Sequence, residues 1–183
     1  YQSVIILSLI ILLGSSCKKF LTEDPKNLVA ITNFYKTETD AVAAVNAIYS
    51  YLNSTSTGST AGVYHSTFWV MSGLASDEMY NQEIFAPDLD QISKFTHGPI
   101  NASIQETWTM HYKAITLANI AIARIPGIQM DETLRTRLLN EAHFLRGLLY
   151  FDMVRMFGNI PLVLEETAPL TPEPVVASAI YDL

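Results

Sequence analysis

The stretch from Glu141 to Val163 reads EAHFLRGLLYFDMVRMFGNIPLV and decides the fold, because it holds much of one long helix and the signal that ends it. We predict that this helix runs from about Asp131, a good N-cap residue, to Phe157, where Gly158 stops it. Apolar side chains surround nearly the whole circumference of its second half, so neighbouring elements must bury it on several sides. These side chains are Leu134, Leu138, Leu145, Leu148, Leu149 and Met156 on the main stripe, and Phe144, Phe151, Val154 and Phe157 around it.

A second helix is predicted upstream, from about Ser103 to the stop at Pro126 and Gly127. Ser103 and Glu106 have the spacing of a capping box at its start. The linking residues 126–130 are so few that the two helices are expected to form an antiparallel hairpin. One face of the second helix carries Ile104, Trp108, Tyr112, Ile115, Asn119 and Ile122.

Three polar residues lie on or beside these apolar faces. Asn119 is interpreted as a core asparagine whose amide bonds to neighbouring backbone, because an unpaired buried amide is costly. Glu141 and Asp152 could each pair with an arginine on their own helix, at i,i+4 and i,i+3 spacing. General acid–base catalysis needs carboxyl groups that face an open pocket, so structural pairing is the favoured interpretation.

A further helix is predicted to begin at Thr37, where Thr37 and Asp40 form a start signal related to the capping box. The Ser-, Thr- and Gly-rich stretch 53–62 ends it. Residues 22–36 are polar and lack periodicity, which indicates a linker. The apolar face of this helix consists of Ala41, Val42, Val45, Ile48, Tyr49 and Leu52.

The amino-terminal residues have the layout of an export signal. An apolar run from Val4 to Leu13 precedes small residues and then Cys17, the chain's one cysteine. As a helix this run would span about 15 Å, half of the roughly 30 Å that a membrane span must cross. We therefore predict a signal peptide at 1–16, lipidation of Cys17, and a lipid anchor and linker at 17–36. The alternative is an incidental cysteine in a discarded leader.

Composition restricts the possible functions. The chain has 183 residues, 49% of them hydrophobic, and a formal net charge of −7, which excludes a disordered chain and argues against a nucleic-acid surface. Its four histidines do not have the spacing of a metal site, and no phosphate loop or nucleophile elbow occurs. We expect no catalytic residues, no cofactor and no metal.

Residues 141–163 closely resemble the signature of the SusD/RagB family of bacterial outer-membrane nutrient-binding lipoproteins. The matching positions keep the order and spacing of that signature. Supporting matches are the leader with its Cys-Lys-Lys-Phe-Leu start at 17–21, the stretch Ala75-Ser76-Asp77-Glu78, and Asn119. The matching positions of the signature are Glu141-Ala142, Phe144-Leu145-Arg146, Tyr150-Phe151, Val154-Arg155, Phe157-Gly158 and Ile160-Pro161-Leu162-Val163.

The resemblance implies an all-α protein with tetratricopeptide-like packed helix pairs and long ligand-binding loops. It implies a surface-exposed outer-membrane lipoprotein, not an enzyme, that binds a nutrient such as an oligosaccharide and delivers it to a SusC-like TonB-dependent transporter. Members of the family are longer than this chain, so 37–183 would be the amino-terminal part of their helical domain.

The resemblance also places ligand contacts in loops, and the stretch 64–98 is rich in aromatic and amide side chains. Such side chains suit sugars, which present flat C–H faces and outward hydroxyl groups. The candidate ligand-binding residues are Trp69, Tyr80, Asn81 and Gln82, within a set that also includes Phe85 and Gln91. Trp69 and Phe85 could instead fill space beneath the loop. A lipid-anchored helical scaffold that binds only protein is the alternative function.

Overall fold

The computed structural model describes residues 34–53, 62–82, 85–167 and 172–181. Contacts divide the chain into two units, Tyr1–Phe34 and Tyr35–Leu183, and the second unit contains every element described below. The predicted signal peptide, Cys17 and nearly all of the linker lie outside the described residues.

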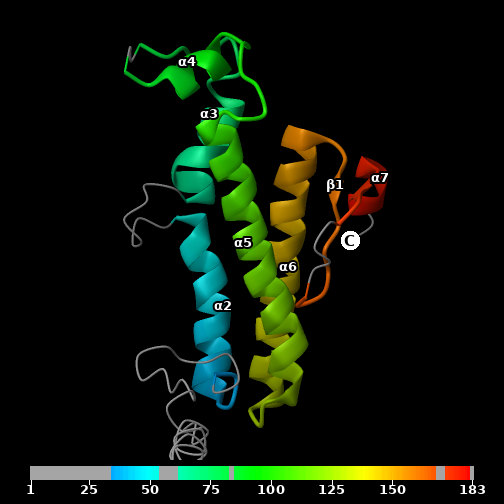
Figure 1. Ribbon diagram of the computed structural model, residues 1–183. Helices are drawn as coiled ribbons and strands as arrows, with labels where there is room; N and C mark the ends of the chain where they lie inside the picture. Colours follow the sequence, from blue (N-terminus) through cyan, green and yellow to red (C-terminus); the bar gives the residue numbers. More distant parts are fainter. Residues whose placement is uncertain (1–33, 54–61, 83–84, 168–171, 182–183) are drawn as a thin grey trace, which may run out of the picture. The chain divides into compact units, whose positions relative to one another are not determined.

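Three long helices form the body of this unit and lie side by side (Figure 1). They are α2 (Glu38–Leu52), α5 (Ala102–Arg124) and α6 (Glu132–Phe157). A short 3-10 turn, Ile125–Gly127, lies between α5 and α6, which run antiparallel as predicted. The prediction of an all-α fold built from packed helices is therefore confirmed.

The helix ends show which local signals were correctly interpreted. Thr37 and Asp40 form the capping box of α2, and the Asp131 carboxylate accepts a hydrogen bond of 2.9 Å from the Leu134 amide at the start of α6. Gly158 ends α6 with a φ of 73°, a conformation that favours glycine. The predicted Ser103 capping box is wrong: Asn101 caps α5, accepting from the Ser103 and Ile104 amides at 3.1 and 3.2 Å.

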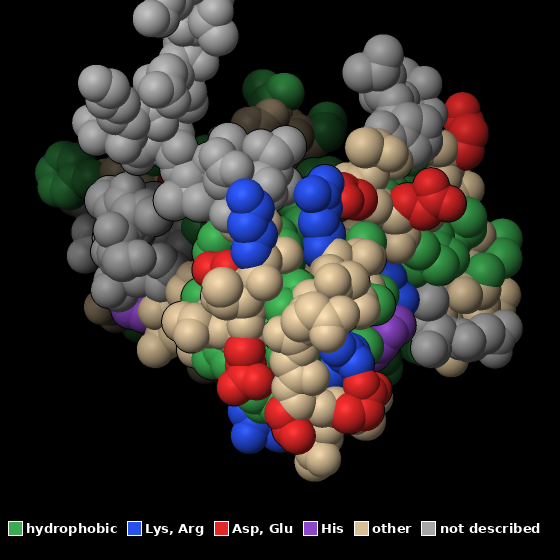
Figure 2. Space-filling model, turned by 90° about the horizontal axis from the view of Figure 1, so that it is seen from below, with side chains coloured by type: hydrophobic (Ala, Val, Ile, Leu, Met, Phe, Trp, Pro, Cys, Tyr) green, Lys and Arg blue, Asp and Glu red, His purple; other side chains and the backbone are tan. Residues whose placement is uncertain are grey.

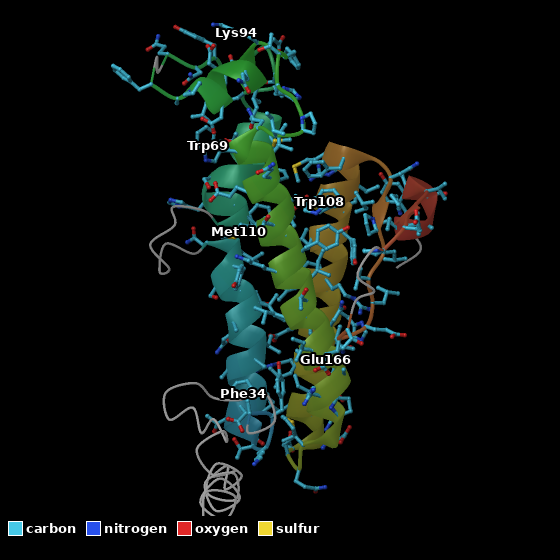
Figure 3. All side chains as sticks on the ribbon, in the orientation of Figure 1. Phe34, Trp69, Lys94, Trp108, Met110 and Glu166 are labelled. Carbon is cyan, nitrogen blue, oxygen red and sulfur yellow. The ribbon has the colours of Figure 1, made fainter. Side chains whose placement is uncertain are left out.

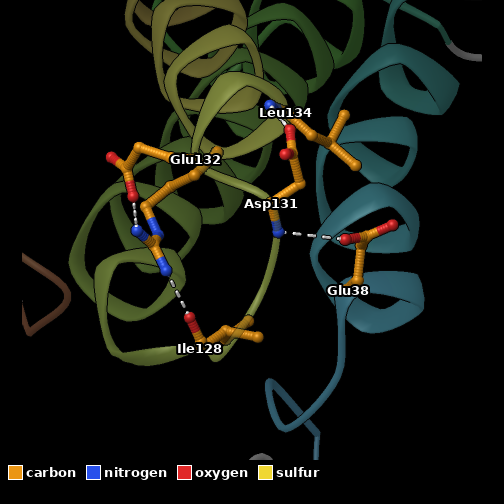
Figure 4. Close-up of polar contacts among 6 residues, drawn as sticks. Glu38, Ile128, Asp131, Glu132 and Leu134 are labelled. Carbon is orange, nitrogen blue, oxygen red and sulfur yellow. Dashed lines mark hydrogen bonds and ion pairs between the residues drawn. The ribbon is translucent and has the colours of Figure 1, made fainter.

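Polar contacts fix the lower end of α2 against the turn between α5 and α6 (Figure 4). The Asp131 amide donates to a Glu38 carboxylate oxygen at 3.2 Å, which links the start of α6 to the start of α2. Arg135 pairs with Glu132 and also donates to the Ile128 carbonyl at 2.7 Å. Figure 2 views this end, where acidic and basic side chains are mixed on the visible surface.

Buried side chains lie along α2, α5 and α6 where these three helices pack together. Small side chains such as Ala41, Ala114 and Ala118 are fully buried, which lets the helices approach closely. The buried centre of α5 is rotated from the predicted face, because α5 has neighbours on two sides. Trp108 and Tyr112 are therefore only half-buried. One cluster of buried residues contains Val63, Met110, Ala114, Ile115, Leu149, Tyr150, Met153, Val154, Ile160 and Ile180.

The segment after α6 folds back along the α5–α6 hairpin. Strand β1 (Ile160–Pro161) pairs antiparallel with β2 (Pro174–Val175), and the short helix α7 (Ala177–Ile180) follows. Asn119 holds this segment, since its amide donates to the carbonyls of Val163 at 2.8 Å and Glu165 at 3.2 Å. The prediction of a core asparagine bonded to backbone is confirmed.

His111 is fully buried on α5 and is held in one tautomer. Its Nδ1 lies 2.7 Å from the Thr107 carbonyl oxygen and so donates to it, whereas Nε2 has no partner among the described residues. Burial lowers the pKa of His111 below its ordinary value, against the opposing effects of the Thr107 hydrogen bond and the Asp152 charge. The folded protein therefore favours the neutral ring.

We expect the free energy of unfolding to fall as the pH drops below about 6.5, the ordinary histidine pKa. The unfolded chain takes up a proton there that folded His111 resists, so protonation favours unfolding. His111→Leu should reduce this slope, measured by urea unfolding across the acidic range. His143→Gln is the companion variant, because burial also lowers the pKa of His143. An unchanged slope in His111→Leu would contradict the assignment.

None of the helices within the described residues is long and apolar enough to cross a membrane.

Candidate ligand-binding site

The predicted ligand-binding stretch forms a cap at the upper end of the long helices (Figure 1). It contains a π-helical turn, Val63–Thr67, and two short helices, α3 (Phe68–Ser72) and α4 (Pro87–Ser93). A small core beneath them consists of Val70, Leu74 and Ile92, with Met71, Ala75, Leu89 and Ile104 packed against it. The cap is thus a set of short helical turns where the sequence indicated loops.

Asn101 and Ser103 tie α4 to the first turn of α5. The Asn101 amide donates to the Asp88 carbonyl at 2.9 Å and to Gln91 Oε1 at 3.0 Å, while its oxygen caps α5. The Ser103 hydroxyl donates to the Asp88 carboxylate. Asn101 is 4% exposed, so these bonds are shielded from water and fix α4 in place.

The opposite end of the cap is anchored to α6 through the buried Asp152. The Tyr64 hydroxyl donates to Asp152 Oδ2 at 2.6 Å, and Arg155 pairs with the other carboxylate oxygen. Burial, and then the hydrogen bond to Asp152, raise the pKa of the Tyr64 phenol. Asp152 therefore has the predicted structural partner, Arg155, and a second partner that the sequence did not reveal. Glu141 likewise pairs with Arg137 at 3.2 Å, as predicted.

Three of the four predicted ligand-binding residues lie together. Tyr80 is 71% exposed, and its hydroxyl accepts a hydrogen bond of 2.6 Å from the Gln82 amide. Between them, the Asn81 backbone amide donates to the Ser93 hydroxyl of α4 at 3.3 Å. The aromatic ring of Tyr80 and the amide side chain of Gln82 are therefore exposed to solvent, while the backbone between them is held to α4 by the Asn81–Ser93 hydrogen bond.

Gly73 allows this segment to pack against the end of α3. A Cβ atom at Gly73 would lie 2.5 Å from the Met79 sulfur and 2.8 Å from the Trp69 carbonyl oxygen, so a larger residue would force both apart. Because glycine has no side chain, the segment that carries Met79 and Tyr80 can lie beside α3, the helix that carries Trp69.

Trp69, the fourth predicted residue, is 41% exposed, and its indole N–H donates to the His65 carbonyl at 2.9 Å. It lines a pocket of about 210 Å³ where the π-helical turn, α3, α4 and α5 meet. The walls of this Trp69 pocket are Ser66, Trp69, Val70, Asp88, Leu89, Ser103 and Glu106.

The sequence did not identify the other polar residues of the Trp69 pocket. Asp88, Ser103 and Glu106 come from two helices, and the short α4 has too few residues to show periodicity. The usable signal was Pro87 followed by Asp88, a typical helix start. Glu106 was interpreted as the partner of a Ser103 cap, although Ser103 bonds to Asp88 instead.

Larger and shallower hollows run along the outer face of α5. One of about 500 Å³ lies between Tyr51 of α2 and Lys113 of α5, and another of about 290 Å³ lies between Trp108 and Pro161. The Trp69 pocket differs from them in having a buried polar atom, the Ser66 hydroxyl oxygen, that has no hydrogen-bond partner within the described part of the chain. Among the described residues, no group of His, Cys, Asp or Glu could hold a metal ion.

The fold and this site define a class: a helical protein whose surface presents aromatic, amide and acidic groups suited to binding. Residues 19–177 match the model of a SusD-like family, described as "Starch-binding associating with outer membrane". The chain belongs to this SusD-like family, whose members are binding proteins and not enzymes. The predicted family, the tetratricopeptide-like helical fold and the non-enzymatic class are thereby confirmed.

Named relatives agree with this assignment. SusD-like proteins P2 and P25 of Formosa agariphila are 30% and 27% identical to the chain, covering 89% and 98% of it. These matches take up 31% and 36% of the two relatives, so the chain spans about a third of their length.

Solved structures show the same similarity. A laminarin-binding SusD-like protein superposes with a TM-score of 0.69 at 27% identity, over 81% of this chain and 32% of its own. Surface glycan-binding protein A from Bacteroides fluxus superposes with a TM-score of 0.63 at 24% identity, over 80% of this chain and 31% of its own.

Proposed function

We propose that the protein captures an oligosaccharide at the bacterial cell surface and delivers it unchanged to a SusC-like TonB-dependent transporter. The observation that carries this proposal is the match of residues 19–177 to a starch-binding family associated with the outer membrane. A structurally similar relative binds laminarin, and another is a surface glycan-binding protein. These descriptions support a glycan as the nutrient.

The geometry of the cap supports the same ligand class. Tyr80 offers an exposed aromatic face, and Gln82 and Asn81 add amide groups beside it. Aromatic faces pack on sugar C–H groups, and amides donate to and accept from hydroxyl groups. We propose Trp69, Tyr80, Asn81 and Gln82 as ligand contacts.

Exposed apolar side chains on the cap and just after it support a protein partner as well. Phe85, Phe95 and Ile100 are 88%, 67% and 86% exposed, and Phe95 has a φ of 55°. Large apolar side chains in contact with water are typical of surfaces that another protein covers. In the proposed function this partner is the transporter. The same side chains also favour the alternative, a helical scaffold that binds protein without glycan affinity.

The amino-terminal sequence supports attachment to the outer membrane. We propose that residues 1–16 are a signal peptide, that Cys17 is lipidated, and that 17–36 form the anchor and linker, with the protein on the outer face of the membrane. The apolar run followed by small residues and Cys17 motivates this proposal, together with the family's association with the outer membrane.

Isothermal titration of the intact protein against neutral oligosaccharides tests glycan binding. We expect Tyr80→Ala to raise the Kd about three- to tenfold, because it removes one aromatic contact surface. Tyr49→Ala on α2 is the matched control, since Tyr49 is also partly exposed, at 41%, and lies on a different helix. No heat with any glycan, alongside retained binding to the transporter, would favour the scaffold instead.

A further inference from the structure

We infer that the Trp69 pocket takes one neutral sugar ring and excludes rings that carry carboxylate or sulfate groups. This inference rests on the proposed function, because it names the class of glycan that the cap would accept. It depends on the size of the pocket, its aromatic wall and the sign of its charge.

The pocket is suited to a single ring. Its volume of about 210 Å³ is below the roughly 300–1,000 Å³ of pockets that enclose whole small molecules. Trp69 supplies an aromatic wall from α3, with Val70 and Leu89 as apolar neighbours. Such walls suit the C–H face of a sugar ring.

The polar groups of the pocket favour hydroxyl ligands. Asp88 accepts from Ser103 through Oδ2, which leaves Oδ1 able to accept from a ligand hydroxyl. The Ser66 hydroxyl oxygen is buried and has no partner among the described residues. Hydrogen bonds from sugar hydroxyls to carboxylates are charge-assisted and therefore stronger than neutral ones. A buried hydroxyl without a partner is costly unless a ligand or water satisfies it.

The charge of the pocket opposes anions. Two of its lining residues, Asp88 and Glu106, are acidic, and none is Lys or Arg. Lys94, at the end of α4, pairs with Asp90 at 2.8 Å and stands at the top of the cap in Figure 3. An anionic group that entered the pocket would meet like charge from these carboxylates, and the chain's net charge of −7 adds to the repulsion.

Titration of the intact protein with paired glycans tests this inference. The ligands are neutral oligosaccharides of glucose, mannose, xylose and galactose, each beside a sulfated or uronate counterpart of the same linkage. We expect the anionic member of a bound pair to bind about tenfold more weakly at low salt. This gap in Kd between the neutral and the anionic member of a pair should shrink at about 1 M salt, where the Debye length is only about 3 Å.

Three variants locate the effect. Asp88→Asn combined with Glu106→Gln should bring the members of a pair to within about threefold and remove the salt dependence of the gap. Asp77→Asn combined with Asp90→Asn is the matched control, because it removes the same charge from the cap outside the pocket. Trp69→Ala should weaken neutral binding about tenfold.

The outcomes separate this inference from the proposed function. If neutral and anionic members bind equally to the natural protein, or if the control variant closes the gap as fully as the pocket variant, the inference is wrong while glycan capture stands. If a gap is present but does not respond to salt, repulsion is not its cause and the inference is also wrong. If no glycan binds at all, the proposed function fails and the inference fails with it.

Discussion

Replacing Asn119 by leucine is expected to lower the free energy of unfolding by about 2–4 kcal/mol, because it removes three hydrogen bonds, one of them to a charged group. The Asn119 amide donates to the Val163 and Glu165 carbonyls, and its oxygen accepts from Arg146 at 2.9 Å. Leucine has a similar size, so the packing volume is nearly kept while the polar contacts are lost.

Arg146 makes this substitution more costly than the loss of a neutral contact. Burial lowers the pKa of Arg146, which shows that its charged form is partly desolvated. Without Asn119, the guanidinium would retain a contact of 3.3 Å to the Leu164 carbonyl and one of 3.4 Å to His143. Losing a partner of a desolvated charge is among the larger single effects on stability.

Urea unfolding measures this effect, and Asn140→Leu is the matched control. Asn140 is exposed on α6, so its replacement should change the free energy of unfolding by no more than about 0.5 kcal/mol. If Asn119→Leu unfolds at the same urea concentration as the natural protein, the backbone bonds of Asn119 do not hold the 160–166 segment.

Cys17→Ala is expected to move the protein from the membrane fraction to the soluble fraction. Each buried methylene of an acyl chain contributes about 0.8 kcal/mol, and several chains on one cysteine give durable attachment, whereas a single chain gives reversible binding. Removing the acceptor thiol would remove all of them together. The change is therefore expected to be nearly complete.

Fractionation of cells that make the protein, with labelling by a radioactive fatty acid, measures the change. Ser16→Ala is the matched control, because it alters the neighbouring small residue and keeps Cys17. The control should stay labelled and sediment with membranes. A Cys17→Ala protein that still sediments with membranes would refute the anchor.

Local signals predicted most of the helical body. The Thr37 and Asp40 capping box, the Asp131 cap and the Gly158 stop define α2 and α6 because each acts within a few residues of the chain. The same reasoning failed at α5, where Asn101 and Ser103 both suit a cap. Asn101 is the residue that caps α5, because its side-chain amide also donates to Asp88 and Gln91 of α4. These are tertiary contacts.

The candidate site was predicted in part. Composition indicated the stretch 64–98 and its aromatic and amide residues, and the structure brings Tyr80 and Gln82 together, with Trp69 in a pocket of its own. The sequence did not indicate that Asp88 and Glu106 lie near each other, because they are on different helices. The packing of these helices depends on the small core under the cap.

The sequence alone determined which segments form long helices, where α2 and α6 begin, where α6 ends, and which family the chain resembles. These features depend on spacing and capping between residues close in the chain. Only the tertiary structure decided which side of α5 is buried, that Tyr64 bonds to Asp152 from 88 positions away, and that Trp69 lines the same pocket as two acidic residues. Such contacts depend on how the helices pack against one another. That packing is determined by all the side chains on each helix surface together, and not by residues close in the chain.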